Sequence, residues 1–376
     1  MTFHLAVALN DTGWHPAAPP GDVLEPDFWV SQIQEAERGL ATLVTLEDGF
    51  ARPGLDSVLI ALRAGPVTSH IGLVPTVVAT HTEPFHVSTQ IATLDWVTSG
   101  RAGERIKVSA DPAEAALFGR RDPASETREG LFEEAADHVE VQRRLWDSWE
   151  DDAEIRDAAT NRFVDRDKLH YIDFVGSHFA VRGPSITPRP PQGQPIVTAL
   201  AHVDTAYRLA ARCADLVFTT PDGVGRDGPT GDAATTLRGV RSAEAEIGRV
   251  GASGATGGGQ QPTQVLGDLV VFLDDDATAA STRWTRLDGE RTLRSDADVF
   301  AGTVEQLATK LEGWAAAGLD GARLRPAVAD HDLPRIARDL APELARRGLT
   351  RTAYEADTLR GLLGLEKPAD RYAGVQ

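Results

Sequence analysis

Several apolar segments that we expect to form strands are followed by residues that could line a site. They are Asn10, Glu47, Asp48, Thr80, Ser109, Ala201, His202, Thr219 and Thr220. In an α/β barrel the carboxyl ends of the parallel strands meet at one face and supply the active site. No nucleophile–base pair is evident among these residues, so no catalytic residue is assigned. Scattered polar groups are typical of a barrel that holds an organic cofactor; the alternative is that each one caps a strand end.

The histidines, the cysteine and the glycine-rich loops predict no other chemistry. His81 and His86 are five residues apart, which does not align two ligands on a helix face, and we expect no metal site. Residues 223–228 match G-x-G-x-x-G, but Pro229 follows and no helix start is placed to receive a pyrophosphate. Cys213 is the single cysteine, which excludes an internal disulfide, and its helical surroundings predict buried packing.

The stretch 70–110 shows which strands and helix would position the polar residues at the strand ends. Residues 71–78 are apolar and β-branched, and Pro84 suits the first turn of a helix, with Thr82 as the expected N-cap. Apolar residues then recur at helical spacing, and a new strand is expected to start at Ile106. Strand, helix and strand in this order predict two parallel strands joined by a right-handed crossover.

The same alternation continues along the chain. Strands are expected at 3–9, 41–46, 71–78, from 106, and at 196–200, 215–219, 265–273 and 321–324. Helices are expected at 27–40, 55–64, 131–149, 204–213, 233–247, 303–317 and 333–347. About eight strands alternating with helices predict an α/β fold of the (β/α)₈ TIM-barrel type with insertions. A doubly wound sheet is the alternative architecture.

No break in composition divides the chain, so we expect one domain over residues 1–376. A hairpin excursion is expected near 171–182, outside the strand–helix rhythm. The Gly-rich and Pro-rich stretches near 221–231 and 251–263 are expected to be flexible loops.

Charge and hydropathy restrict the partners. The net charge of −18 argues against nucleic acid or an anionic membrane as a partner, because both require clustered Lys and Arg. No apolar run approaches the ~18 residues that a membrane span needs. The amino terminus, MTFHLAVALND, has no basic leader or cleavage site. We therefore expect a soluble, cytoplasmic protein.

Several long stretches resemble one family. They are TVVATHTEPFHVSTQIATLDWVTSGRAG at 76–103, FVDRDKLHYIDFVGSHFAVRGPSITPRPPQGQPIV at 163–197, LAARCADLVFTT at 209–220 and FAGTVEQLATKLEGWAAAGLDGARLRP at 300–326. In this order they are similar to the bacterial luciferase-like flavin monooxygenases. The group typified by nitrilotriacetate and dibenzothiophene-sulfone monooxygenases is the most similar one. The resemblance covers nearly the whole chain.

The resemblance implies a TIM barrel that binds reduced FMN supplied by a separate reductase. FMN would react with O₂ to give a peroxyflavin that oxygenates a small organic substrate, such as an organosulfur, amine or carboxylate compound. Members commonly form homo-oligomers. Two alternatives remain open: a deazaflavin-dependent oxidoreductase on the same barrel, and a barrel that has lost turnover and serves as a binding protein.

Carried over residue by residue, the resemblance gives five cofactor-binding candidates: Asp48, Thr80, Arg105, His202 and Val203. Asp48 and Thr80 match family positions. Arg105 stands where the family usually has an asparagine, Phe132 where it has a tyrosine, and residues 199–203 where it has a Gln-Ala-Gly-Ser-Ser phosphate loop. Arg105, His202 and the backbone amides before Asp204 would replace the lost donors. The Asp204 carboxylate would repel a phosphate if it pointed inward.

Overall fold

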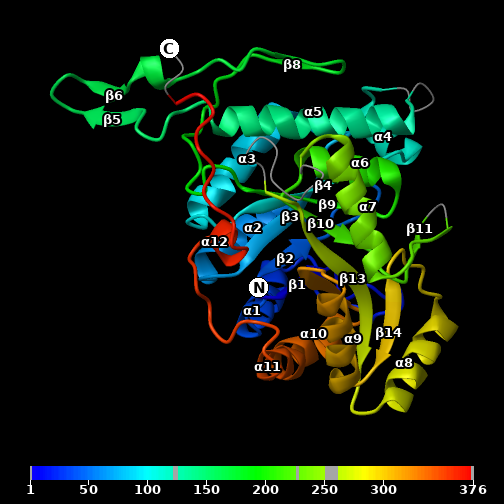
Figure 1. Ribbon diagram of the computed structural model, residues 1–376. Coiled ribbons are helices and arrows are strands. Elements are labelled where there is room, and N and C mark those ends of the chain that lie inside the picture. Colours follow the sequence, from blue (N-terminus) through cyan, green and yellow to red (C-terminus); the bar gives the residue numbers. More distant parts are fainter. Residues whose placement is uncertain (1, 122–125, 226–227, 250–260, 374–376) are drawn as a thin grey trace.

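Eight parallel strands close into a barrel surrounded by helices (Figure 1). The computed structural model describes residues 2–121, 126–225, 228–249 and 261–373. The barrel strands are β1 (His4–Leu9), β2 (Leu43–Leu46), β3 (Gly72–Val78), β4 (Gly103–Lys107), β9 (Ile196–Leu200), β10 (Leu216–Thr219), β13 (Gln264–Leu273) and β15 (Gly321–Pro326). They pair in chain order, and parallel pairing of β1 with β15 and of β10 with β13 completes the circle. The predicted (β/α)₈ barrel is confirmed.

Helices connect the strands on the outside of the barrel. They are α1 (Pro26–Arg38), α2 (Ser57–Ala64), α3 (Pro84–Val97), α5 (Arg128–Trp146), α6 (Asp204–Cys213), α7 (Ala233–Glu246) and α9 (Val304–Ala316). Side chains cap most of their amino termini, for example Asp56 at α2, Thr127 at α5 and Asp232 at α7. No helix among the described residues is long and apolar enough to cross a membrane.

The βαβ unit predicted at 70–110 is present, with two corrections. Pro84 starts α3 as expected, but the N-cap position is Glu83, whose side chain makes no capping hydrogen bond. The Thr82 hydroxyl donates instead to the Val78 carbonyl at 3.0 Å. Strand β4 begins at Gly103, three residues before the expected start. Arg105 is therefore a residue in the middle of a barrel strand.

The expected helix at 333–347 is split into three pieces. Helix α10 (Ala329–Arg335) contains Pro334, a π-helical turn (Ile336–Leu340) follows, and α11 (Ala341–Arg346) completes the segment. Proline has no backbone donor and clashes with the preceding turn, which disturbs the regular hydrogen-bond ladder.

Strand β13 has two neighbours along one edge. Its first residues pair with β10, and residues 269–273 pair with an additional parallel strand, β14 (Asp298–Gly302). Helix α8 (Ala277–Glu290) precedes β14, and neither element was predicted. β14 lies outside the closed ring of eight strands. The carboxyl ends of the eight parallel strands form one face of the barrel, which we call the mouth.

The chain leaves the barrel between α5 and β9. Two antiparallel strand pairs lie there, β5 (Glu154–Asp157) with β6 (Arg162–Val164), and β7 (Phe174–Val175) with β8 (Ala180–Val181). Figure 1 shows both pairs beyond the helical layer: the hairpin with β8 runs alongside α5, and β5 and β6 lie beyond one end of that helix. The second pair falls within the excursion expected at 171–182. A further short pair, β11 (Val224–Gly225) with β12 (Gly228–Pro229), occupies the expected loop at 221–231; most of 251–263 lies outside the described residues.

The opposite end of the barrel is closed by a short helix, α12 (Leu359–Leu362). Leu359 and Leu363 pack with residues of β1, β2, β3, β9, β10 and β13, including Leu43 and Val74. Gly72 makes room for this contact, because a Cβ there would lie 2.5 Å from Leu359 Cδ1. The barrel interior therefore has an apolar floor, and its polar residues lie toward the mouth.

Candidate functional site

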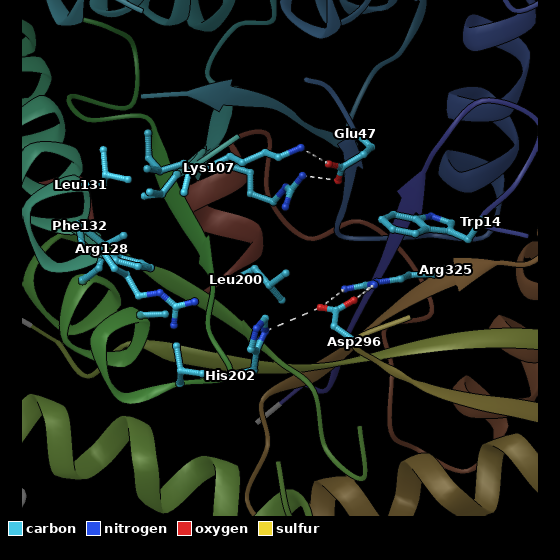
Figure 2. Close-up of a pocket in the computed structure, with 17 residues that line it drawn as sticks. Trp14, Glu47, Lys107, Arg128, Leu131, Phe132, Leu200, His202, Asp296 and Arg325 are labelled. Carbon is cyan, nitrogen blue, oxygen red and sulfur yellow. Dashed lines mark hydrogen bonds and ion pairs between the residues drawn. The ribbon is translucent and has the colours of Figure 1, made fainter. Parts of the chain in front are cut away.

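A cavity of about 390 Å³ opens at the mouth of the barrel (Figure 2). Strands β4, β9 and β15 and the loops after β1 and β2 supply its inner wall, and α5 and α6 supply the outer one. The inner wall carries mainly charged groups, and the outer wall is mainly apolar, with Leu131, Phe132 and Leu209. Its volume lies within the range of small-molecule sites, roughly 300–1,000 Å³.

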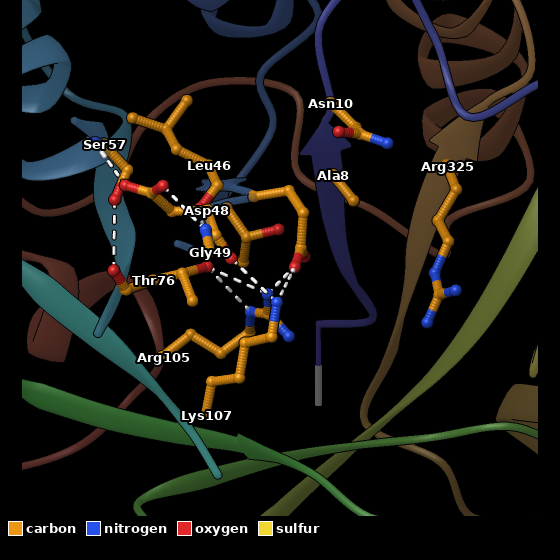
Figure 3. Close-up of polar contacts among 12 residues, drawn as sticks. Ala8, Asn10, Leu46, Asp48, Gly49, Ser57, Thr76, Arg105, Lys107 and Arg325 are labelled. Atoms are coloured by element: carbon orange, nitrogen blue, oxygen red, sulfur yellow. Dashed lines mark hydrogen bonds and ion pairs between the residues drawn. The ribbon is translucent and has the colours of Figure 1, made fainter. Parts of the chain in front are cut away.

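Glu47 binds two cations on the inner wall (Figure 2). One carboxylate oxygen pairs with Arg105 Nη2, and the other lies 3.1 Å from Lys107 Nζ. Arg105 also donates to Thr76 Oγ1 through Nε at 3.2 Å and through Nη2 at 2.9 Å (Figure 3). Burial alone would raise the pKa of Glu47, but the charges of Arg105 and Lys107 outweigh it and lower that pKa to about 2. Glu47 is therefore an anion at any physiological pH.

Asp268 holds two arginines inside the barrel. It accepts hydrogen bonds from Arg323 Nε at 2.5 Å and from Arg325 Nε at 3.1 Å, with an Nη2 contact from each. Arg323 also lies over the Phe218 ring, 4.0 Å from its centroid. All three charged side chains are fully buried. Asp268 lies within the strand predicted at 265–273, and these pairings explain a charge in an otherwise apolar strand.

Arg325 extends this network to the cavity. Its Nη1 donates to Asp296 Oδ1 at 2.6 Å, and its guanidinium lies over the Trp14 ring, 4.5 Å from the centroid. Burial raises the pKa of Asp296, but the charge of Arg325 outweighs it, and the net effect lowers this pKa well below its usual range. Asp296 directly precedes β14, so this additional strand delivers the carboxylate to the cavity.

His202 and the start of α6 form another part of the cavity wall. His202 Nδ1 is 3.8 Å from Asp296 Oδ2, too far for a hydrogen bond, and is buried without a described partner. Val203 is the N-cap residue of α6 and cannot cap it through its side chain. Both residues line the cavity, whereas Asp204 is exposed and does not. The start of α6 therefore borders the cavity through Val203, whereas the carboxylate of Asp204 in its first turn does not line it.

Three of the five predicted site residues meet at this cavity: Arg105, His202 and Val203. Asp48 does not line it; its carboxylate accepts from the amides of Gly49 at 2.7 Å and Ser57 at 2.8 Å. Thr80 also lies off the cavity, and its hydroxyl accepts from the Ser109 amide at 3.0 Å. Asp48 and Thr80 thus hold the loops that follow β2 and β4.

Residues that the sequence reasoning missed supply much of the cavity charge: Lys107, Arg128, Asp296 and Arg325. A signal was present for two of them. Lys107 follows Arg105 at a spacing of two, and Arg325 follows Arg323 likewise, within strands that are otherwise buried. Side chains two apart on a strand share a face, so such pairs indicate a charged barrel interior. Nothing in the sequence indicated that Asp296 lies at the cavity, because its position depends on β14, which was not predicted.

The fold and the cavity define the class of protein: a (β/α)₈ barrel with a ligand site at the carboxyl face of its strands, where enzymes of this fold carry their active sites. The chain belongs to the luciferase-like monooxygenase family, whose model matches residues 1–321. It is accordingly a flavin-dependent monooxygenase.

Individual relatives agree with this membership. The chain is 29% identical to N-acetyl-S-(2-succino)cysteine monooxygenase of Bacillus subtilis (strain 168), with 98% of each chain covered. It is 29% identical to nitrilotriacetate monooxygenase component A of Aminobacter aminovorans, covering 96% of this chain and 95% of the relative. Among solved structures, DmoA from Hyphomicrobium sulfonivorans superimposes with a TM-score of 0.84 at 20% identity, covering 100% of this chain and 97% of that one. The alignment with the Bacillus protein spans 440 positions, so that relative carries insertions that this chain of 376 residues lacks.

Proposed function

We propose that this chain is the oxygenase component of a two-component system, which takes reduced FMN from a separate flavin reductase and oxygenates a small organic substrate. The observation that carries the proposal is the cavity at the barrel mouth, which borders the start of α6 and holds His202, whose Nδ1 has no hydrogen-bond partner among the described residues. A helix amino terminus without a side-chain cap suits a phosphate, because its amides point outward and its dipole favours negative charge.

The residues present fit FMN. The amides of α6, His202 and Arg128 would hold the phosphate, replacing the serines of the family loop with a helix end, an imidazole and a guanidinium. Figure 2 shows the Arg128 guanidinium and the His202 ring on the same side of the cavity as α6. The apolar side chains of Leu131, Phe132 and Leu200 offer a surface for the organic part of the molecule.

Bound reduced FMN supplies the oxygen chemistry, passing one atom of O₂ to the substrate while the other becomes water. The protein has three tasks in this scheme. The α6 end, His202 and Arg128 anchor the cofactor; the apolar outer wall keeps water away from the reacting groups. The ion pairs at Glu47 and Asp296 fix the inner wall in place, so that little reorganisation is needed when a ligand arrives.

The proposal is tested by anaerobic titration of the protein with dithionite-reduced FMN, followed by admission of O₂. We expect one equivalent of FMN to bind, and His202→Ala to weaken binding by roughly tenfold, the scale of one charge-assisted hydrogen bond. His331→Ala is the matched control, because His331 contacts Asp274 at 2.9 Å outside the cavity.

Three results would contradict the assignment. Absence of FMN binding in both redox states would point to a barrel without turnover. Reduction of a deazaflavin with no O₂ consumption would favour the deazaflavin-dependent alternative. An equal loss of affinity in the His202 and His331 variants would remove His202 from the cofactor site.

A further inference from the structure

Two cationic side chains surround the single negative charge of Glu47. Arg105 and Lys107 both pair with this one carboxylate, which gives the three residues, here called the Glu47 cluster, a net charge of +1. The neighbouring network does not balance it: Arg323 and Arg325 are matched by Asp268 and Asp296. An excess charge in a partly desolvated site is costly unless an opposite charge joins it.

Both cations keep donors that no described residue uses. An ammonium group has three N–H donors. Lys107 uses two of them, donating to Glu47 Oε1 at 3.1 Å and to the Asp48 carbonyl at 2.8 Å. Arg105 donates hydrogen bonds through Nε and Nη2. Its Nη1 has no acceptor among the described residues and is not fully buried. Because both residues line the cavity, the remaining donors are available to a ligand.

The Glu47 cluster lies apart from the phosphate site proposed above. In Figure 2, Lys107 and Glu47 lie on one side of the cavity and His202 on the other. The cluster is also fixed before any ligand arrives, since Thr76 orients Arg105 and the Asp48 carbonyl orients Lys107. A rigid pair of donors on two cations matches the two oxygens of a carboxylate or sulfonate.

We propose that Arg105 and Lys107 bind the anionic group of the substrate, a small organic carboxylate or sulfonate. This inference rests on the proposed function, because it assigns the substrate end of the same cavity. Glu47 positions both cations and limits their affinity, since it competes with the substrate anion for the same donors.

The test uses the flavin-free protein and four probes: butyrate, propane-1-sulfonate, neutral butyramide and inorganic phosphate. Dissociation constants come from ligand-observed NMR titrations. We expect the two organic anions to bind more tightly than butyramide, and Lys107→Met to weaken them by roughly tenfold, as expected for one charged hydrogen bond. Lys107→Met keeps the Arg105–Glu47 pair, which protects the fold.

Two further variants sharpen the test. Glu47→Gln removes the competing carboxylate and should tighten binding of butyrate and propane-1-sulfonate severalfold, a change opposite in direction to that of Lys107→Met. Lys310→Met is the matched control: its side chain is 26% exposed against 33% for Lys107, and it also pairs with carboxylates, but it lies outside the cavity. It should leave all four probes unaffected.

The proposal is overturned if butyramide binds as well as butyrate, or if Lys107→Met changes neither organic anion. It is also overturned if FMN and inorganic phosphate displace butyrate and the affinity for FMN falls tenfold in Lys107→Met, since the cluster would then hold the cofactor phosphate. If the organic anions bind as expected but FMN does not bind at all, the anion site stands and the cofactor proposal fails.

Discussion

Asp268 is the residue that pairs with both buried arginines of β15. Its carboxylate contacts both Arg323 and Arg325, and all three side chains are buried. Removing one member of a buried ion pair leaves the partner charge uncompensated, at a cost of about 3–5 kcal/mol. We expect Asp268→Asn to lower the free energy of unfolding by about that amount, as measured by urea denaturation.

A surface carboxylate provides the comparison. Asp298 pairs with Lys310 at 3.2 Å and is 32% exposed, so Asp298→Asn should cost no more than about 1 kcal/mol. Similar losses in the two variants would show that the arginines are held by packing on Phe218 and Trp14 and not by the charge of Asp268.

At the level of single residues, the sequence predicted part of the candidate site and missed the rest for a physical reason. Arg105, His202 and Val203 were predicted from the family resemblance, His202 also from its place after a strand, and all three line the cavity. Which carboxylate each arginine would meet could not be found, because this depends on the stagger between neighbouring strands. Glu47 reaches Arg105 across two strand pairings, a register that local periodicity does not encode.

At the level of elements, the alternation of apolar strands and helices predicted the barrel and one excursion from it, whereas three other additions were not predicted. Helix α8, strand β14 and the β5–β6 pair are half-buried or exposed, and their sequences carry little periodic apolar pattern. β14 nevertheless shapes the site through Asp296. The elements that the sequence did not predict are thus the ones that this protein has in addition to the eight strands and helices of a standard (β/α)₈ barrel.

Helix α12 provides a prediction at this scale. Leu359 is fully buried against the strands at the barrel floor. Leu359→Ala should lower the free energy of unfolding by about 2–5 kcal/mol, because it removes buried methyl groups and leaves a cavity. Leu117, which is 69% exposed on α4 (Pro112–Phe118), is the control, and Leu117→Ala should change stability by at most about 0.5 kcal/mol. Urea denaturation measures both, and a small loss at Leu359 would mean that the floor stays closed without this side chain.

Over the whole molecule, buried carboxyl groups fall into two sets with opposite pH dependence. Burial raises the pKa of Glu104 to about 8, although a hydrogen bond from Gln142 opposes it, and burial likewise raises the pKa of Asp95 to about 6. Glu47 and Asp215 have lowered pKa values, because nearby arginines outweigh the effect of burial. The first set favours the folded state when protonated, and the second set when ionised.

We therefore expect stability to be greatest in mildly acidic solution. The contribution of Glu104 and Asp95 is complete below about pH 4, their unfolded range, and is lost as the pH rises through about 6 and about 8. The contribution of Glu47 and Asp215 is lost as the pH falls below about 4. Thermal unfolding between pH 4 and 9 measures this profile, and Glu104→Gln, which keeps an acceptor for Gln142, should flatten its alkaline side. An unchanged slope in that variant would exclude Glu104 as the cause.

The barrel floor also determines when the protein can finish folding. Leu43 and Val74 come from the first two strand–helix units after β1, but Leu359 and Leu363, which cover them, follow all eight strands in the sequence. A ribosome therefore delivers all eight strands before the residues that seal them, and Leu43 and Val74 remain open to water, or to chaperones, until α12 has been synthesised. Strand β1 likewise cannot pair with β15 until β15 has been synthesised, more than three hundred residues later. Long-range contacts of this kind slow folding and prolong the exposure of apolar surface.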